Sequence, residues 1–336
     1  KNNPDIKSFD IVMHDCNGIG RGKIIRRNEL IKIYKSGRQF PLSLMGMDIT
    51  GEDVPETGLI FNQGDGDIKA WPIPSSLKPI HKSKPARGEL FMNMHDIKGN
   101  KLSTDPRNQL EKKIGEFKKK GISFRAAFEL EFFLVSNELD EYGKLKPAKS
   151  VIGKKSSRRK TDVYSVDILH GMLPLFDDIY EASVLANIEA ETIISEYAPG
   201  QYELTLKHQN SILKAADDIL RLKRIIRAQA RLHGVTACFM AKPMEDVSGS
   251  GMHFHISLYN KKNKNLFAEK NKKKISKYLS YALGGLSKTM GESMLIFAPN
   301  ANSWRRFIKG SYAPISPNWG IDNRSVAFRI PSSDVQ

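Results

Sequence analysis

Two glutamates lie two residues apart inside an otherwise apolar run, FRAAFELEFFLV, at residues 124–135. Side chains two apart on a strand point to the same face, so Glu129 and Glu131 project together, opposite Leu130. A buried carboxylate is costly unless it is paired or bound to a metal. The spacing leaves two interpretations open: a strand at the water boundary with solvated glutamates, or a strand that presents two acids to a cation.

Two further segments supply groups of the same chemical type. Glu196 and Glu203 flank a Pro-Gly turn in SEYAPGQYELTL, which can fold their carboxylates back toward each other. His253 and His255 share one face of a strand that follows a flexible Gly-Ser-Gly loop. Oxygen ligands dominate this set, which suits Mg²⁺ or Mn²⁺ and argues against zinc. Taken alone, each segment is equally compatible with a solvated acid or a structural histidine.

Arginines gather toward the end of the sequence, in NSWRRF and WGIDNRSVAFRIP. A guanidinium group binds carboxylate and phosphate oxygens through a fork of N–H donors. Arg306, Arg324 and Arg329 are therefore candidates for holding an anionic substrate beside a metal, and arginines in surface ion pairs are the alternative.

The elements that must position these groups follow from periodicity and turn residues. Residues 9–70 combine short alternating segments with Asn-Gly and Gly-rich turns, which predicts a small β-rich N-terminal domain. Asp105-Pro106 predicts the start of a helix that ends at Gly121. An apolar period of helical type runs through 211–234 and stops at a glycine.

A further helix is expected at 166–186, a strand and turn at 89–99, and strands at 235–243 and 252–260. Strands joined by helices, with acidic strand faces, predict an α+β fold. We place the domain boundary before Asp105, which divides the chain into residues 1–104 and 105–336.

The composition is that of a soluble globular protein: 336 residues, of which 40% are hydrophobic and 27% charged. No apolar run approaches the roughly 18 residues of a membrane span, so we expect no membrane partner. Cys16 and Cys238 lie far apart without a metal-type spacing, which fits a reducing, cytoplasmic location.

The net charge of +16 raises the possibility of nucleic-acid binding. The lysines and arginines are scattered in short runs at 118–120, 154–160 and 261–274, with few aromatic residues between them. Such runs are typical of solvated faces and loops, so we expect no nucleic-acid partner.

Six segments, in this order, resemble the successive signature blocks of the glutamine synthetase family: ELEFF, EYAPGQYE, FMAKP, SGSGMHFHISL, NSWRRF and NRSVAFRIP. DCNGIGRGK and MDITGEDVPETG are similar to the family's β-grasp domain, especially in the branch that makes γ-glutamyl amides such as γ-glutamylputrescine. The resemblance spans essentially the whole chain. It implies a β-grasp domain at 1–104 and, at 105–336, a larger catalytic α/β domain built on a curved antiparallel sheet.

The resemblance also implies ligands for two metals. Glu131, Glu196 and Glu203 match the ligands of one, while Glu129 and His253 match ligands of a second that bridges the nucleotide phosphates. Adjacent carboxylates on one strand face would then hold two cations, whose charge compensates for burial.

The remaining implied roles concern substrates. Residues matched to the nucleotide site are His208, His255 and Ser257; those matched to the glutamate site are Gly249 and Arg306; those matched to the transferred phosphoryl group are Arg324 and Arg329. Asp48 resembles the aspartate that a neighbouring subunit contributes near the amine.

By the same resemblance, the chemistry is an ATP-dependent ligation. The side-chain carboxylate of glutamate attacks the γ-phosphate of ATP, and an amine displaces the phosphate from the resulting acyl phosphate. The resemblance implies two or more Mg²⁺ or Mn²⁺ ions per site. It also implies a ring-shaped homo-oligomer, a dodecamer, with active sites between subunits.

The chain departs from the family pattern at one position that bears on the substrate. Glutamine synthetases have GYEAP in a flap, where the glutamate helps to deprotonate ammonium, and this chain has GSYAP, with Tyr312 in the acid's place. Tyrosine, with a reference pKa of about 10, cannot serve as that acid. We therefore predict an alkyl- or polyamine substrate that contacts Tyr312. A glutamine synthetase using ammonium is the alternative, and a catalytically inactive structural member is a third, although all five metal ligands are present.

A second departure is the end of the sequence at RIPSSDVQ, where the family continues with another metal-binding glutamate and a helical tail. Together with the start at Lys1, this leads us to expect a fragment truncated at the C-terminus.

Overall fold

The computed structural model describes residues 3–60, 64–154, 160–269 and 274–332. It forms two compact units, one of residues 1–120 and 181–188, the other of residues 121–180 and 189–336. Residues 155–159 and 270–273, which belong to two of the basic runs, lie outside the described residues. The domain boundary predicted before Asp105 stays a prediction.

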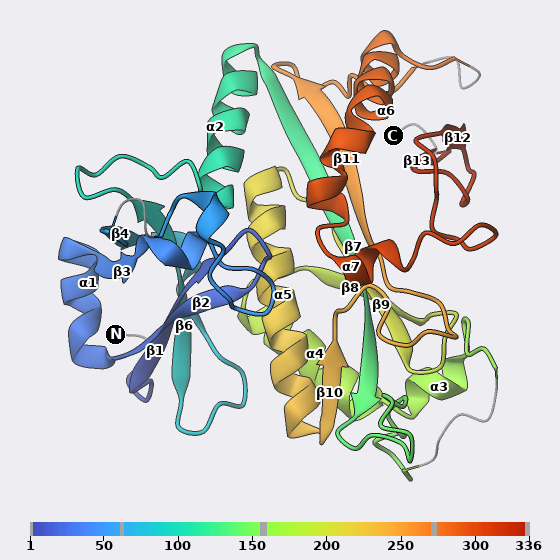
Figure 1. Ribbon diagram of the computed structural model, residues 1–336, viewed down its shortest axis with the longest axis horizontal. Coiled ribbons are helices and arrows are strands. Elements are labelled where there is room, and N and C mark those ends of the chain that lie inside the picture. The colour runs from blue at the N-terminus through green and yellow to red at the C-terminus, as the bar shows by residue number, and fades with distance from the viewer. Residues whose placement is uncertain (1–2, 61–63, 155–159, 270–273, 333–336) are drawn as a thin grey trace. The chain divides into compact units, whose positions relative to one another are not determined.

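The first unit contains a mixed sheet with the strand order β2-β1-β6-β4-β3, and β5 pairs with β6 (Figure 1). Its strands are β1 (Ser8–His14), β2 (Gly20–Arg26), β3 (Arg38–Pro41), β4 (Asp67–Pro72), β5 (Lys78–Pro79) and β6 (Arg87–His95). β1 and β6 run parallel, and the other pairs are antiparallel. The β-rich character expected for residues 9–70 is present; the assignment to the β-grasp class stays a prediction.

Alternation along the strands builds the core of this unit. Phe9, Ile11 and Met13 of β1 pack with alternate residues of β6 in one buried cluster. A short helix that the sequence analysis did not predict, α1 (Leu30–Ser36), adds Ile33 to the same cluster.

The helix predicted after Asp105 is α2 (Pro106–Lys119). The Asp105 carboxylate accepts hydrogen bonds from the backbone N–H groups of Arg107 and Asn108, and Gly121 adopts a φ of 73° beyond the last turn. Start and end are therefore where the capping residues predict them.

The second unit is organised around β7 (Ile122–Ser136), which is fifteen residues long. Its sheet has the order β10-β7-β9-β8, with β11 also paired to β7, and every pair is antiparallel. The other strands are β8 (Ala190–Ser195), β9 (Gln201–Leu206), β10 (Val235–Cys238) and β11 (Met252–Asn260). β11 pairs with residues 122–130 of β7 and β10 with residues 133–136, so the two follow one another along the same strand (Figure 1).

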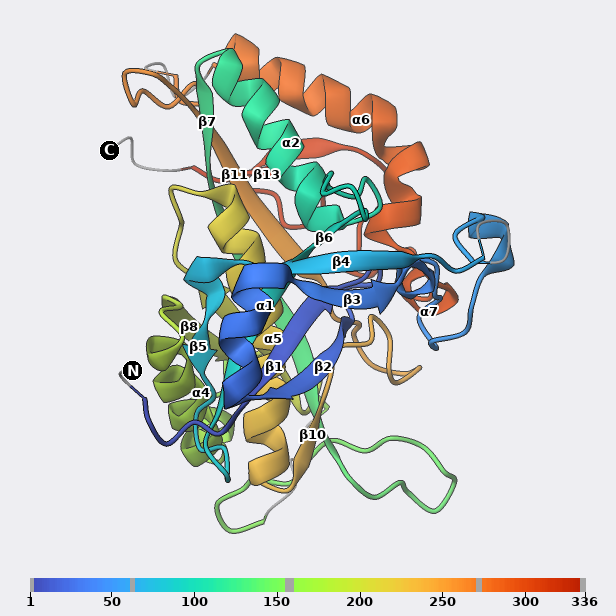
Figure 2. The ribbon, with the colours of Figure 1, turned by 90° about the vertical axis from the view of Figure 1, so that its left-hand side faces the viewer.

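The predicted long helix is α5 (Ile212–Leu232), which packs on β7 and β10 (Figures 1 and 2). Its buried side chains repeat at helical spacing and include Ile219, Leu222 and Ile226. The Ser211 hydroxyl accepts from the N–H of Lys214 at the start, and Gly234 (φ 73°) follows the end.

Two predicted elements differ from those observed, and one more helix was not predicted. The single helix expected at 166–186 is divided into α3 (Val166–His170) and α4 (Leu173–Leu185), because Pro174 lacks the N–H that a continuous helix would need. The strand expected at 235–243 ends at Cys238. The helix α6 (Lys277–Phe297) was not predicted, although Leu279, Leu283, Leu286 and Met290 recur in it at helical spacing.

After α6 the chain forms the short helix α7 (Ala301–Trp304) and a parallel pair of strands, β12 (Trp319–Ile321) and β13 (Phe328–Ile330). Among the residues that the structure describes, no helix is both long and apolar enough to cross a membrane.

Candidate active site

Strand register brings four of the predicted ligands to one face of the sheet of the second unit. Glu131 of β7 lies opposite Glu203 of β9, and Glu129 of β7 lies opposite His253 of β11. Directly opposed residues of antiparallel strands share a face, and residues two apart along β7 do as well. The alternation in ELEFF therefore places its two acids between those of the neighbouring strands.

The turn between β8 and β9 adds Glu196. Its N–H donates to the carbonyl of Gln201 at 2.8 Å, which closes the turn, and Gly200 adopts a φ of 76° within it. The carboxylate of Glu196 accepts from the N–H of Tyr197 at 3.2 Å. The Pro-Gly turn thus folds Glu196 back toward Glu203, as the sequence predicts.

The ligand atoms form two overlapping groups, each within 4.8 Å. One comprises Glu131, Glu196 and Glu203, and the other Glu129, Glu203 and His253, so Glu203 belongs to both. Glu203 is buried, and three carboxylates at this separation repel one another. The donor set is rich in oxygen and fits hard divalent cations such as Mg²⁺ or Mn²⁺.

The protonation of the first group shows how strongly the acids oppose one another. Burial, with added repulsion from Glu131 and Glu203, raises the pKa of Glu196 to about 7. Burial also raises the pKa of Glu131. Without a cation, this group therefore holds a proton close to neutral pH.

In the second group a histidine supplies the positive charge. His253 Nδ1 lies 2.7 Å from Glu129 Oε2 and 3.5 Å from Glu203 Oε2, and these carboxylates raise its pKa to about 10. His255 Nε2 lies 3.0 Å from Glu129 Oε1. Hydrogen bonds from the two histidines hold the pKa of Glu129 far below its usual range. A divalent cation would take the place of the proton on His253.

The loop before β11 lies against this cluster. The Gly251 N–H donates to Glu131 Oε2 at 2.9 Å, and Arg306 packs on the other side of the loop. A Cβ added to Gly249 would lie 2.5 Å from the Ala241 carbonyl oxygen and 2.7 Å from Arg306 Cγ. The predicted glutamate-binding positions, Gly249 and Arg306, are therefore in direct contact.

Sequence reasoning missed Gln201, which is 1% exposed and joins the same loop to the acids. Its side-chain nitrogen lies 3.3 Å from Glu131 Oε2, 3.1 Å from the Gly249 carbonyl and 3.2 Å from Ser250 Oγ. A signal was present in the sequence, because Gln201 precedes Glu203 by two residues and must share its strand face.

The residues matched to the nucleotide lie beyond the histidines. The rings of His208 and His255 meet edge to face with centroids 5.8 Å apart, and Ser257 follows on the same face of β11. These three positions continue the line of polar groups that begins at His253.

The structure does not bring every predicted residue to the carboxylates. Arg324 and Arg329 are exposed near β13, and no hydrogen bond or ion pair links them to the acids within the described ranges. Asp48 belongs to the first unit, where its Oδ1 accepts four hydrogen bonds from residues 50–52. These bonds lower its pKa and hold the loop.

Tyr312 is 74% exposed, and its ring lies 6.3 Å from that of Tyr197, inclined by 55°. Tyr197 directly follows Glu196, so the tyrosine predicted to contact the amine is paired with a residue next to a candidate metal ligand.

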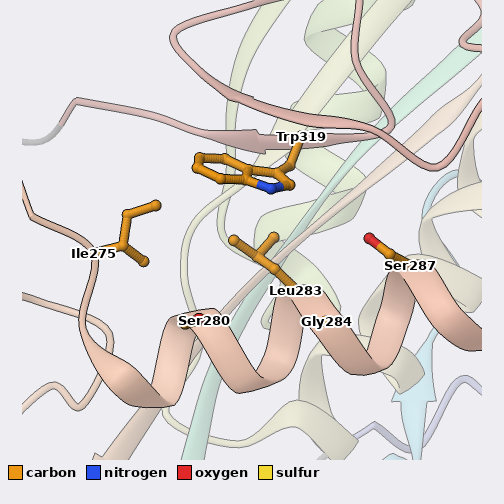
Figure 3. A pocket seen from close by; sticks show the side chains of 6 residues that line it. All are labelled: Ile275, Ser280, Leu283, Gly284, Ser287 and Trp319. Carbon is orange, nitrogen blue, oxygen red and sulfur yellow. The ribbon is translucent and has the colours of Figure 1, made fainter.

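A small pocket of about 200 Å³ lies elsewhere in the second unit, between α6 and Trp319 (Figure 3). It is lined by Ile275, Ser280, Leu283, Gly284, Ser287 and Trp319. None of these residues was predicted to act in the site, and none is a carboxylate, imidazole or guanidinium group.

Comparison with known proteins agrees with the resemblance seen in the sequence. Residues 103–336 match the family model described as glutamine synthetase, catalytic domain. The chain is 38% identical over 331 residues to the γ-glutamylputrescine synthetase of Escherichia coli (strain K12), covering 98% of this chain and 70% of that protein. It is 31% identical over 329 residues to a glutamate–isopropylamine ligase of Pseudomonas sp, covering 95% and 69%. A solved structure described as a novel glutamine synthase homolog superimposes with a TM-score of 0.83 at 23% identity, covering 98% of this chain and 74% of that one.

Proposed function

The chain belongs to the glutamine synthetase family and is a ligase of the glutamate–amine type, and we propose that its amine is an alkylamine or polyamine rather than ammonium. Two similar proteins are named for putrescine and isopropylamine, which are amines of this class. The family is ATP-dependent and uses divalent metals.

The pairing of Tyr312 with Tyr197 beside Glu196 is the observation that carries the proposal. The two rings are 74% and 45% exposed, so their faces are open to a ligand. Aromatic faces attract both alkyl groups and ammonium groups, whereas ammonium alone gains little from an extended apolar wall. A longer amine would lie along the rings with its reacting nitrogen toward the acids.

Arg306 is proposed to bind a carboxylate of the glutamate substrate. The side chain is partly buried, and its Nε is buried without a hydrogen-bond partner in the described structure. A buried donor without a partner is costly, and a substrate carboxylate would satisfy it. The neighbouring Gly249 lets Arg306 pack closely against the loop, because a Cβ there would clash with the Ala241 carbonyl oxygen and with Arg306 Cγ.

In the proposed reaction the γ-carboxylate of glutamate attacks the γ-phosphorus of ATP, releasing ADP and forming γ-glutamyl phosphate. The amine then attacks the carbonyl carbon, and inorganic phosphate leaves with the electron pair of the broken C–O bond. Divalent metals held by Glu129, Glu131, Glu196, Glu203 and His253 would neutralise the phosphate charge. An alkylammonium group must first lose a proton, and carboxylates beside the tyrosines are suited to accept it.

Further roles are proposed on the family pattern. His208, His255 and Ser257 are proposed to contact the nucleotide, and Arg324 and Arg329 to steady the transferred phosphoryl group. Asp48 is proposed to reach the amine from a neighbouring subunit of a ring-shaped dodecamer.

The test is ADP release by the full-length protein with ATP, glutamate and Mg²⁺, comparing ammonium with putrescine, spermidine, ethylamine and methylamine. We expect kcat/KM for at least one alkylamine or polyamine to exceed that for ammonium. Higher kcat/KM with ammonium would identify a glutamine synthetase, and ATP binding without turnover of any amine would identify an inactive family member.

Variants test the role of the tyrosine. Tyr312→Glu restores the family's flap acid and removes the ring, so the ratio of kcat/KM for alkylamine over ammonium should fall by about tenfold or more. Tyr142→Glu is the matched control, because Tyr142 is 78% exposed in a loop of the same unit. An unchanged ratio in Tyr312→Glu would remove Tyr312 from the amine site.

A further inference from the structure

We propose that Gln201 is a positioning residue that ties the candidate metal ligand Glu131 to the glutamate-binding loop Gly249–Gly251. Its buried amide would then govern the affinity for the metal and the affinity for glutamate. The effect on glutamate affinity rests on the proposed function. The effect on metal affinity rests only on the geometry of the carboxylate cluster.

The amide of Gln201 has a defined orientation. Its Oε1 accepts from the N–H of Ala198 at 3.2 Å, which directs the NH₂ group toward Glu131, Gly249 and Ser250. Two N–H donors are thus shared among three acceptors, at distances of 3.1 to 3.3 Å. At 1% exposure, water cannot replace any of these bonds if the amide is lost.

The loop is held to β7 by a second set of bonds. The Gly251 N–H donates to Glu131 Oε2 at 2.9 Å, and the Glu131 N–H donates to the Gly251 carbonyl at 3.3 Å. Glu131 therefore bonds the loop directly through its carboxylate and backbone, and indirectly through Gln201. Its carboxylate cannot turn without disturbing Gly251.

Arg306 completes the connection, because it also packs against the loop. Its guanidinium lies so close to Gly251 that an added Cβ there would be 3.0 Å from Nη2. A shift of the loop would therefore move the surface on which Arg306 rests. This contiguous path, Gln201 to Glu131 to Gly251 to Arg306, joins the acids to the proposed carboxylate-binding arginine.

The test replaces the amide by a side chain of similar length without donors, Gln201→Met. Groups that orient a metal ligand typically contribute 10–100-fold to metal affinity, so we expect the Mn²⁺ dissociation constant to rise by about tenfold or more. Calorimetric titration of Mn²⁺ alone into the full-length protein measures this without any turnover. In steady-state assays, KM for glutamate should rise by about tenfold, with kcat at saturating glutamate and Mn²⁺ reduced by less than about threefold.

The matched control is Gln229→Met, which replaces another glutamine of 1% exposure, on α5. It should leave Mn²⁺ affinity and the glutamate KM unchanged. The inference is overturned if the Mn²⁺ dissociation constant and the glutamate KM of Gln201→Met both stay within about twofold of the wild type, or if only one of the two changes.

Gln201→Asn keeps the question decidable if Gln201→Met does not fold. It retains the amide on a side chain shorter by one methylene, so the NH₂ group cannot keep all of its bonds to Glu131 and Gly249. Mn²⁺ binding should weaken by roughly two- to fivefold, a loss consistent with one hydrogen bond; no change would count against the proposal. If the wild type binds Mn²⁺ but turns over no amine, the proposed function fails, while the Mn²⁺ comparison still decides the role of Gln201.

Discussion

Glu203 is the residue on which both candidate metal groups depend. It contributes an oxygen to each, whereas Glu129 and Glu196 contribute to one each. Its place in the middle of the face follows from register, because β9 sets it opposite Glu131 while His253 reaches it from β11.

We predict that Glu203→Gln weakens Mn²⁺ binding at both positions, and that Glu129→Gln weakens it at one. The amide keeps the size of the side chain but loses the charge that attracts the cation. Calorimetry or electron paramagnetic resonance gives the number of Mn²⁺ ions bound per chain. A Glu203→Gln protein that retains one site of wild-type affinity would contradict the assignment of a shared ligand.

The pKa values of the empty cluster predict how metal affinity changes with pH. Glu196 is raised to about 7 and His253 to about 10, so both carry protons at pH 6 that a metal must displace. Affinity should therefore fall as the pH decreases, by about tenfold per pH unit for each displaced proton, and more steeply below pH 7 than above it.

Mn²⁺ titrations at several pH values between 6 and 8.5 test this dependence. Glu196→Gln removes the group that titrates near 7 and should abolish the steeper part of the curve, although overall affinity also falls. Glu191→Gln, which changes an exposed carboxylate on β8, should leave the curve as it is in the wild type. A pH-independent affinity in the wild type would contradict the protonation of Glu196 and His253.

The element that sets the distance between Glu196 and Glu203 is the turn from β8 to β9. Gly200 has a φ of 76°, and a Cβ there would lie 2.9 Å from both the Leu134 carbonyl oxygen and Pro147 Cβ. The position therefore excludes a side chain twice, by backbone conformation and by space.

We predict that Gly200→Ala lowers the free energy of unfolding by more than the roughly 1–2 kcal/mol of the left-handed conformation alone, and also weakens Mn²⁺ binding. Gly143→Ala is the control, because Gly143 has a φ of 74° but nothing within 4 Å of an added Cβ. Gly143→Ala should lower the free energy of unfolding only by the cost of the left-handed conformation, and it should leave Mn²⁺ affinity unchanged. Urea unfolding and Mn²⁺ calorimetry separate the two effects, and equal losses in both variants would show that the close approach at Gly200 is unimportant.

At the scale of the whole molecule, the chain separates into two units, and the acids, imidazoles and Arg306 all belong to the second. Asp48 belongs to the first, where it is occupied in holding its own loop. Its role near the amine is proposed for the site of a neighbouring subunit, in a ring where one subunit completes the site of the next.

Mixed oligomers test that proposal. Asp48→Ala and Glu203→Gln chains, each inactive alone, should regain activity when co-expressed, because some interfaces combine an intact first unit with an intact second unit. Random mixing in a closed ring predicts about a quarter of wild-type activity. No gain of activity on co-expression would place Asp48 and Glu203 in the same site of one chain, and full activity of Asp48→Ala alone would exclude Asp48.

The local features of the second unit could be predicted because their causes are local. A period of two puts Glu129 and Glu131 on one face of β7, and Ser211 and Gly234 bound α5 through backbone groups only a few residues away. The family blocks then named Glu196, Glu203 and His253, which the fold places together. By contrast, the break between α3 and α4 depends on a proline within an otherwise helical pattern, and α6 was missed although its apolar residues recur at helical spacing.

The sequence by itself determined which residues share a strand face, where the capped helices begin and end, and which side chains could bind a cation. Only the tertiary structure decided that Glu203 lies between two ligand groups, that Gln201 reaches the loop before β11, and that Tyr197 meets Tyr312. The reason is physical. Alternation and capping arise from bonds within a few residues, whereas the register of β7 with β9 and β11 is chosen by burial of faces from distant parts of the chain.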